Sequence, residues 1–278
     1  MKIGIRGHDI GRLNSQDFVV TLQKNKIEVI QLVLNKALLD YQSPMTVEKA
    51  KCLAQPFINA GIEVAMLGAY FNPIHSNKEV KEAAVLNFKA HLLVAELFKT
   101  KYVGSETGSY QDDRWIYHPY NETEAAYQKT LAVFQDLVKT AQSVNKSVAI
   151  EGAFQHVIST PSRLKRLVDD LNSDHVNVIV DLFNYLDISN HTQYKDIFLE
   201  CMALLKDKIV IFHLKNYLVV EDKLVQVSLE KGNFDYQYLL SLMKKHCPEA
   251  YLILEGITGE DIKKSIDFVT NILKELPE

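Results

Sequence analysis

Cysteine is scarce in this sequence. The 278 residues contain three, Cys52, Cys201 and Cys247, which lie far apart and form no C-x-x-C pair. An odd number at this spacing argues against a disulfide framework and against a metal site built from thiolates. The pattern is typical of a protein kept in a reducing compartment, and we expect a cytoplasmic location.

Long apolar runs and concentrated positive charge are also missing. No stretch approaches about 18 consecutive apolar residues, and the N-terminal MKIGIRGHDIGRL lacks the apolar core of an export signal. The 31 basic and 35 acidic residues are dispersed and give a net charge of -4, so no basic stripe is available to neutralise a run of phosphates. We therefore expect neither a membrane nor a nucleic acid as a partner.

Short runs rich in β-branched residues alternate with amphipathic stretches along the chain, which predicts parallel strands covered by helices. The expected strands are Lys2–Arg6, Ile27–Leu34, Ile62–Leu67, Tyr102–Ser105, Ser147–Ile150, Val176–Val180, Ile209–Phe212 and Tyr251–Leu254. The expected helices are Ser15–Lys24, Thr46–Asn59, Lys78–Lys99, Glu122–Asn145, Pro161–Leu171, Gln193–Lys206, Asp235–His246 and Gly259–Leu276. Ser15 and Thr160 are expected helix N-caps, and Gly61 is an expected C-cap.

The number of strands distinguishes between two folds. Eight strand-helix units in this chain give about 35 residues each, close to what a (β/α)8 barrel of roughly 250 residues requires. A doubly wound open sheet is the alternative, but the G-x-G-x-x-G that usually follows its first strand is absent. With no linker and no low-complexity segment, the sequence predicts an α/β protein with a single TIM-barrel domain over residues 1–278.

Polar side chains end the last four expected strands. The apolar runs SVAI, VNVIV, IVIF and YLIL are followed by Glu151, Asp181, His213 and Glu255, respectively. In a closed barrel these strand ends meet at one mouth, so the four side chains are expected to surround a shared point.

Three carboxylates in a partly dry mouth repel one another unless a cation balances them. A divalent ion removes this repulsion, and three oxygen donors with one imidazole suit Mn²⁺, Co²⁺, Mg²⁺ or Zn²⁺. Each residue also has an ordinary structural interpretation, because Asp181 suits a helix cap and a lone His213 suits a buried, hydrogen-bonded histidine. The sequence thus predicts one divalent metal ion bound by Glu151, Asp181, His213 and Glu255.

Six short motifs lie along the chain, most of them at an expected strand end. They are LGAYFNPIH (Leu67–His75), AIEGAFQH (Ala149–His156), VIVDLFNYL (Val178–Leu186), IFHLKN (Ile211–Asn216), EKGNFDY (Glu230–Tyr236) and ILEG (Ile253–Gly256). In their order and spacing the chain resembles the sugar phosphate isomerase and epimerase family with a xylose isomerase-like TIM barrel, which includes ketose 3-epimerases and AP endonucleases. The resemblance covers almost the whole chain.

The resemblance implies roles for the residues at these positions. The four strand-end residues bind the metal, and Glu151 and Glu255 are also the acid and the base on opposite faces of a sugar. The metal polarises a carbonyl, one glutamate removes the neighbouring proton to leave a cis-enediolate, and the other returns a proton.

Further substrate-binding residues are expected beside this centre. The resemblance suggests that His156 and Lys215 contact substrate hydroxyls or a developing oxyanion. The alternatives are a bond from His156 to a loop carbonyl and a solvated loop lysine at 215. Asn184 stands where some relatives have a metal-binding histidine, which favours a hydrogen bond to substrate over coordination. Glu106, in GSETGS, either points into the mouth or caps its loop.

Two further features have open interpretations. Arg6 either engages a phosphate or carboxylate of a substrate or pairs with an internal acid such as Asp9. Trp115 and Tyr117 lie in a long loop after the fourth strand, which suits a lid.

The leading functional prediction is a divalent-metal-dependent isomerase or epimerase of a small sugar, sugar acid or sugar phosphate. A dehydratase or lyase on the same metal site is the alternative. An AP-endonuclease-like phosphodiesterase fits less well, because Asn184 replaces an expected histidine and the net charge is negative. A non-catalytic sugar-binding protein is disfavoured because both glutamates are present. The expected partner is a small carbohydrate; a homo-oligomer is compatible with the family, although no sequence feature defines an interface.

Overall fold

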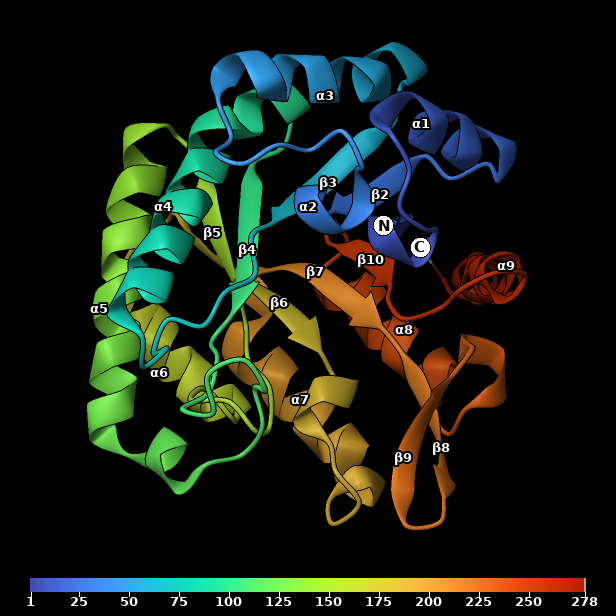
Figure 1. The fold of residues 1–278 in the computed structure, drawn as a ribbon. Helices are drawn as coiled ribbons and strands as arrows, with labels where there is room; N and C mark the ends of the chain where they lie inside the picture. Colours follow the sequence, from blue (N-terminus) through green and yellow to red (C-terminus); the bar gives the residue numbers. More distant parts are fainter. Residues whose placement is uncertain (278) are drawn as a thin grey trace.

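Parallel strands form a closed eight-stranded barrel in the computed structural model, which describes residues 1–277 (Figure 1). Around the barrel the order is β1-β10-β7-β6-β5-β4-β3-β2, and β2 pairs with β1 to complete the ring. These strands are β1 (Lys2–Arg6), β2 (Val29–Leu32), β3 (Glu63–Gly68), β4 (Tyr102–Glu106), β5 (Ser147–Glu151), β6 (Val176–Asp181), β7 (Ile209–Leu214) and β10 (Tyr251–Leu254). The TIM barrel predicted from the sequence is confirmed.

Helices surround the barrel (Figure 1). They are α1 (Ser15–Lys24), α2 (Leu34–Ala37), α3 (Val47–Ala60), α4 (Lys78–Val94), α5 (Glu124–Ser143), α6 (Pro161–Leu171), α7 (Tyr194–Leu205), α8 (Tyr236–His246) and α9 (Asp261–Glu275). Thr160 caps α6 through the Arg163 N–H, and Gly61 ends α3 with a φ of 69°. No helix within residues 1–277 is long and apolar enough to cross a membrane.

Three expectations about the secondary structure were wrong. The second strand is shorter than Ile27–Leu34, because the chain turns into α2 at Leu34 and a buried apolar run does not distinguish strand from helix. The N-cap of α1 is Asn14, which accepts the Asp17 N–H; the Ser15 hydroxyl instead donates to Asp40. The helix expected over Lys78–Lys99 is shorter, since α4 ends at Val94 and the chain continues as a 3-10 turn over Ala95–Phe98.

An antiparallel hairpin was not predicted. It consists of β8 (Asn216–Val220) and β9 (Lys223–Val227), directly after β7, and projects beside the barrel (Figure 1). Glu221 and Asp222 form its two-residue turn, with φ values of 48° and 57°. Gln226 of β9 donates a hydrogen bond to the Glu255 backbone oxygen at 2.5 Å, so the hairpin contacts the end of β10.

The strand registers bring the predicted polar residues to one end of the barrel. Asp181 is paired with His213 across β6 and β7, and Glu106 with Glu151 across β4 and β5. Because side chains alternate along a strand, the residues two positions earlier point into the same interior. That layer is apolar and fills the barrel below the polar ends: Val29, Ala65, Met66, Ala149, Ile179, Ile211 and Ile253.

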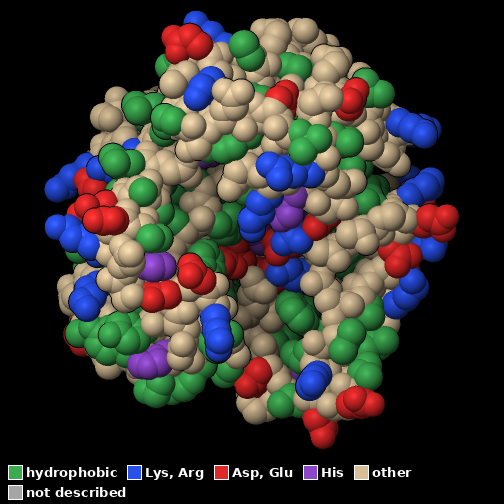
Figure 2. All heavy atoms as spheres, viewed as in Figure 1, with side chains coloured by type: hydrophobic (Ala, Val, Ile, Leu, Met, Phe, Trp, Pro, Cys, Tyr) green, Lys and Arg blue, Asp and Glu red, His purple; other side chains and the backbone are tan. Residues whose placement is uncertain are grey.

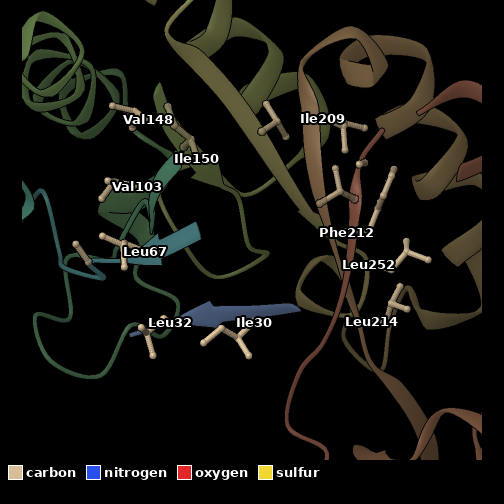
Figure 3. Packing of buried hydrophobic residues seen from close by; sticks show 14 of the residues in the cluster. Ile30, Leu32, Leu67, Val103, Val148, Ile150, Ile209, Phe212, Leu214 and Leu252 are labelled. Carbon is tan, nitrogen blue, oxygen red and sulfur yellow. The ribbon is translucent and has the colours of Figure 1, made fainter. Parts of the chain in front are cut away.

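A larger apolar cluster lies between the barrel and its helices. Figure 3 shows its strand residues, among them Ile30, Leu67, Val148 and Phe212, on the sides of the strands that face the helices. Phe212 packs against Phe198 of α7 with ring centroids 6.2 Å apart. The two clusters together make the strands rigid supports for the side chains at their ends.

Gly4 in β1 provides a test of this packing. A Cβ at Gly4 would lie 2.6 Å from the Val29 backbone oxygen, which belongs to the neighbouring strand and cannot move independently. We expect Gly4→Ala to lower the free energy of unfolding by about 1–3 kcal/mol. Gly104→Ala is the matched control, because its Cβ would meet the flexible Met66 side chain. Urea denaturation that shows Gly4→Ala to be no worse than Gly104→Ala would contradict this interpretation.

Candidate functional site

The carboxyl ends of the strands open into two adjoining cavities. The first is about 290 Å³ and is lined by residues that include Arg6, Tyr70, Glu106, Trp115, Glu151 and Glu255. The second is about 200 Å³; it shares Glu106 and Trp115 with the first and adds His156 and Asn184. Figure 2 shows a hollow near the middle of this face, with acidic, basic and histidine side chains gathered around it.

Glu151, Asp181 and His213 form a group that can hold a metal ion. They end β5, β6 and β7, all three are buried, and one ligand atom from each lies within 4.8 Å of the others. The Nδ1 atom of His213 is 3.4 Å from Glu151 Oε2 and 3.7 Å from Asp181 Oδ2. Adjacent parallel strands that end in ligands thus produce the cluster expected from the sequence.

Two buried atoms of this group lack a well-aligned hydrogen bond from residues 1–277, namely Asp181 Oδ2 and His213 Nδ1. Their closest charged neighbours are Lys215 Nζ, 2.7 Å from Asp181 Oδ2, and Glu255 Oε2, 3.0 Å from His213 Nδ1. A cation bound to the lone pairs of both atoms would satisfy them more fully, which fits a metal ion. Carboxylate oxygens and an imidazole are ligands that Mg²⁺, Mn²⁺, Co²⁺ and Zn²⁺ accept in different degrees.

Gln31 of β2 orients the histidine. Its side chain is buried, its Oε1 lies 2.7 Å from His213 Nε2, and its Nε2 donates to the Tyr70 hydroxyl at 2.8 Å. This arrangement assigns the proton of a neutral imidazole to Nε2, so Nδ1 directs a lone pair at the carboxylates. The sequence analysis missed Gln31, although one amide in the apolar run VIQLVL is a signal of a buried polar role.

Replacement of Gln31 tests this orienting role. Loss of a buried partner that fixes a metal-binding histidine typically weakens metal affinity by about 10- to 100-fold, and we expect that loss for Gln31→Ala. Calorimetric titration of the metal-free protein with Mn²⁺ measures it. Gln23→Ala, on the exposed face of α1, is the matched control and should bind as the wild type does. Equal affinities for the two variants would show that Gln31 does not act through His213.

Glu255 lies beside the three-residue group but is not a member of it in the described chain. Its Oε2 is 3.0 Å from His213 Nδ1, and its Oε1 is 2.7 Å from Arg6 Nη1. Arg6 also pairs with Asp9, which in turn accepts the Gly256 N–H at 2.7 Å. Of the two interpretations of Arg6, the structure shows the internal ion pair. The role of Glu255 as a fourth ligand stays a prediction.

Lys215 is buried in the site, so the alternative of a solvated loop lysine was wrong. Its Nζ lies 2.7 Å from Asp181 Oδ2 and 2.8 Å from Glu255 Oε1. It also donates to Asn184 Oδ1 at 3.0 Å. Asn184 in turn donates to Glu151 Oε1 at 2.8 Å, which links the lysine to the glutamate of β5. The sequence places Lys215 near the site because it follows His213 closely, but it does not predict the ion pairs that Lys215 forms.

The electrostatic argument from the sequence was therefore incomplete. Lys215 and Arg6 supply two positive charges against the carboxylates of Glu151, Asp181 and Glu255, although Arg6 is shared with Asp9. The protein itself balances part of the charge. With His213 neutral, as metal binding requires, a net negative charge remains at the centre and favours a cation.

Burial and these charges separate the pKa values of the acids. Burial, with Glu151 and Glu255 nearby, raises the pKa of Glu106 to about 8, so this carboxyl is protonated at neutral pH. Burial also raises the pKa of Asp181 to about 6 against the opposing effect of Lys215. Burial acts to raise the pKa of Glu255 as well, but Lys215, His213 and Arg6 outweigh it and lower that pKa.

The two histidines at the mouth of the barrel, His213 and His156, have pKa values shifted in opposite directions. Burial lowers the pKa of His213, but Glu151 and Glu255 outweigh it and raise the value to about 9, so a metal ion must replace a proton there. Burial lowers the pKa of His156 to about 4, which keeps that ring neutral. Its Nδ1 is buried without a hydrogen-bond partner among residues 1–277, and its ring meets Trp115 edge to face at 5.6 Å. His156 lines the second cavity with this nitrogen unused, and the alternative of a hydrogen bond from His156 Nδ1 to a loop carbonyl is not seen within residues 1–277.

Comparison with solved structures shows the same fold in many proteins. A D-tagatose 3-epimerase-like protein superposes with a TM-score of 0.77 at 15% identity, over 99% of this chain and 98% of that one. A xylose isomerase-like TIM barrel protein from Mycobacterium smegmatis, in complex with magnesium, has a TM-score of 0.74 at 13% identity, over 99% and 96%. A probable 3-DHS dehydratase from Bacillus anthracis has a TM-score of 0.73 at 15% identity, over 99% of each chain.

Sequence comparison gives the family. No curated protein sequence matches the chain. The family described as xylose isomerase-like TIM barrel matches residues 21–272, which include every strand of the barrel except β1 and all of the strand-end residues described above. This confirms the resemblance inferred from the six motifs, and the chain belongs to the xylose isomerase-like TIM barrel family.

Proposed function

We propose that this protein is a divalent-metal-dependent isomerase or epimerase of a small sugar, sugar acid or sugar phosphate. The observation that carries the proposal is the placement of two glutamates at one histidine. Glu151 Oε2 and Glu255 Oε2 lie 3.4 and 3.0 Å from the same His213 Nδ1, and both glutamates line the first cavity. A substrate in that cavity has a carboxylate from β5 and another from the end of β10 within reach.

Glu151, Asp181 and His213 would hold the metal ion, with Glu255 as the fourth ligand. A bound divalent ion polarises a substrate carbonyl and acidifies the neighbouring C–H bond. Either metal-binding glutamate then serves a second purpose, because a carboxylate oxygen beside that C–H bond can accept its proton.

The protein's own residues divide the proton transfer. Glu255, at the end of β10 beside Arg6, would accept a proton from one face of the substrate. Glu151, whose Oε1 is fixed by Asn184, would donate a proton on the other face, and the balance is restored when Glu151 takes a proton from solvent and Glu255 releases one. Glu106 in its protonated form and His156 can hydrogen-bond substrate hydroxyls, and Lys215 can stabilise a developing oxyanion. Asn184 would orient both Glu151 and Lys215 and, at the edge of the second cavity, bind substrate.

Isotope exchange tests the proposal. The wild-type protein, loaded with Mn²⁺ in D₂O, is incubated with a panel of ketoses, sugar acids and sugar phosphates. Proton NMR should show loss of the C–H signal next to the carbonyl for at least one member, together with an epimer or isomer. Binding without any exchange would overturn the proton-transfer proposal.

A dehydratase or lyase is the second candidate. The likeness to the probable 3-DHS dehydratase favours it, since dehydration next to a carbonyl begins with the same proton removal. Exchange accompanied by a new C=C absorbance, without an epimer, would select this alternative. The phosphodiesterase alternative has less support, because Asn184 bonds to Glu151 and Lys215 and therefore stabilises the acid cluster.

As part of this proposal we expect a cytoplasmic location and a single domain over residues 1–278, and a homo-oligomer is compatible with it.

A further inference from the structure

Lys215 occupies the position between the acids where a cation is expected. It lies two residues after His213, at the end of β7, and is 7% exposed. Its Nζ is 2.7 Å from Asp181 Oδ2 and 2.8 Å from Glu255 Oε1, distances of strong charge-assisted hydrogen bonds. An ammonium at this depth loses its hydration, and only carboxylates this close compensate for the loss.

Asp181 would have two competing cations when a metal is bound. The Oδ2 atom contacted by Lys215 is also the one 3.7 Å from His213 Nδ1, within the metal-binding group. A divalent ion held by Asp181 and His213 would therefore lie close to the ammonium. Two positive charges this close repel each other strongly in a buried site, where little water screens them. A metal ion bound to this oxygen would therefore compete with the ammonium for Asp181.

The structure also provides a place for the displaced ammonium. Lys215 Nζ already donates to Asn184 Oδ1 at 3.0 Å, and Asn184 lines the second cavity. The ring of Phe183, which lines the same cavity, has its centroid 5.8 Å from Nζ, within the range of a cation–π contact. Rotation of the flexible lysine side chain toward these groups would separate it from both carboxylates.

We infer that Lys215 is an internal counter-ion of the metal-free protein, which a bound divalent ion displaces from Asp181 and Glu255 toward Asn184 and the second cavity. This inference rests on the proposed function, since the same three residues bind the metal. Lys215 then has two successive positions: between the acids without metal, and beside the substrate cavity with metal. Competition between the ammonium and the metal sets the metal affinity.

Titration of Lys215→Met with Mn²⁺ tests the inference. Removal of the competing ammonium should lower the Kd by about tenfold or more, because the metal no longer breaks two buried ion pairs. The metal-free variant should melt at a lower temperature than the wild type, since its buried carboxylates lose their partner, and the rise in Tm on adding Mn²⁺ should be larger. Lys223→Met, on the exposed β9, is the matched control and should leave the Kd unchanged.

An unchanged or larger Kd for Lys215→Met would overturn the inference, because the lysine would then be neutral or helpful to metal binding. If neither protein binds Mn²⁺ or the other divalent ions, the proposed function fails first. If the wild type binds one ion per chain and Lys215→Met binds it with the same Kd, the inference alone fails.

Lysine labelling of the wild-type protein tests the displacement of Lys215 without the variant, and so it remains informative if Lys215→Met does not fold. A short pulse of an acetylating reagent, read by mass spectrometry, should modify Lys215 faster with Mn²⁺ than with a chelator. Lys223 serves as the internal reference. An equal or slower rate with Mn²⁺ would overturn the displacement.

Discussion

Glu255→Gln should lower turnover by about 10²–10⁴-fold, and Glu151→Gln by a similar factor, because each removes one group of the proposed acid-base pair. Glutamine keeps an oxygen in place and nearly the same volume, so the loss reports mainly the proton transfer. Both glutamates are buried at strand ends, where the rigid barrel supports their side chains. Rates normalised to the metal content of each preparation exclude a loss that arises only from weaker metal binding.

The two variants should also differ in a way that a purely structural role would not produce. In D₂O, Glu151→Gln should still exchange the proton of the epimer whose C–H bond faces Glu255, without forming the other epimer. Glu255→Gln should show the opposite preference. Glu249→Gln, exposed after α8, is the control and should keep full activity. Equal losses of exchange with both epimers in both variants would argue against the two-glutamate mechanism.

His213→Ala should weaken Mn²⁺ binding by more than about 100-fold, a larger loss than for the orienting residue Gln31. Metal that binds only the folded state stabilises it by about 2.7 kcal/mol at a concentration of 100 times the Kd. We expect Mn²⁺ to raise the Tm of the wild type, a chelator to reverse the rise, and the variant to show almost no response at the same concentration.

His246→Ala, near the exposed end of α8, is the control and should respond to Mn²⁺ as the wild type does. A chelator should also abolish isotope exchange by the wild type, and added Mn²⁺ should restore it. A metal-dependent rise in Tm that survives in His213→Ala would place the ion elsewhere in the molecule.

The strand ends were predictable because parallel β/α units follow a simple rule. Short apolar runs separated by amphipathic helices give the barrel, and its closure brings Glu151, Asp181 and His213 to one mouth whatever the rest of the sequence is. Motifs near these residues added the family. None of this reasoning requires knowledge of how individual side chains turn.

The features of the site that the sequence did not predict depend on contacts between residues far apart in the chain. Gln31 contacts His213 across 182 positions of sequence, and Arg6 reaches Glu255 from the first strand. Periodicity predicts that such residues are buried but not which partner they find. The β8–β9 hairpin was missed for a local reason, because its turn uses Glu221 and Asp222 at positive φ where Asn-Gly is the usual signal.

Lys215 shows most clearly which property of the site could not be predicted from the sequence. Its neighbour in sequence, His213, identified the right region, but the choice between a solvated lysine and a buried ion pair depended on where Asp181 and Glu255 lie in space. Because the buried ammonium of Lys215 pairs with Asp181 and Glu255, the protein itself neutralises part of the negative charge of the site.

Anomalous diffraction from crystals soaked in Mn²⁺ tests the central claim most directly. The account predicts one strong peak within bonding distance of Glu151, Asp181 and His213, with the Lys215 side chain moved away from Asp181. A peak elsewhere, or no peak at saturating Mn²⁺ with Lys215 still bound between Asp181 and Glu255, would contradict it.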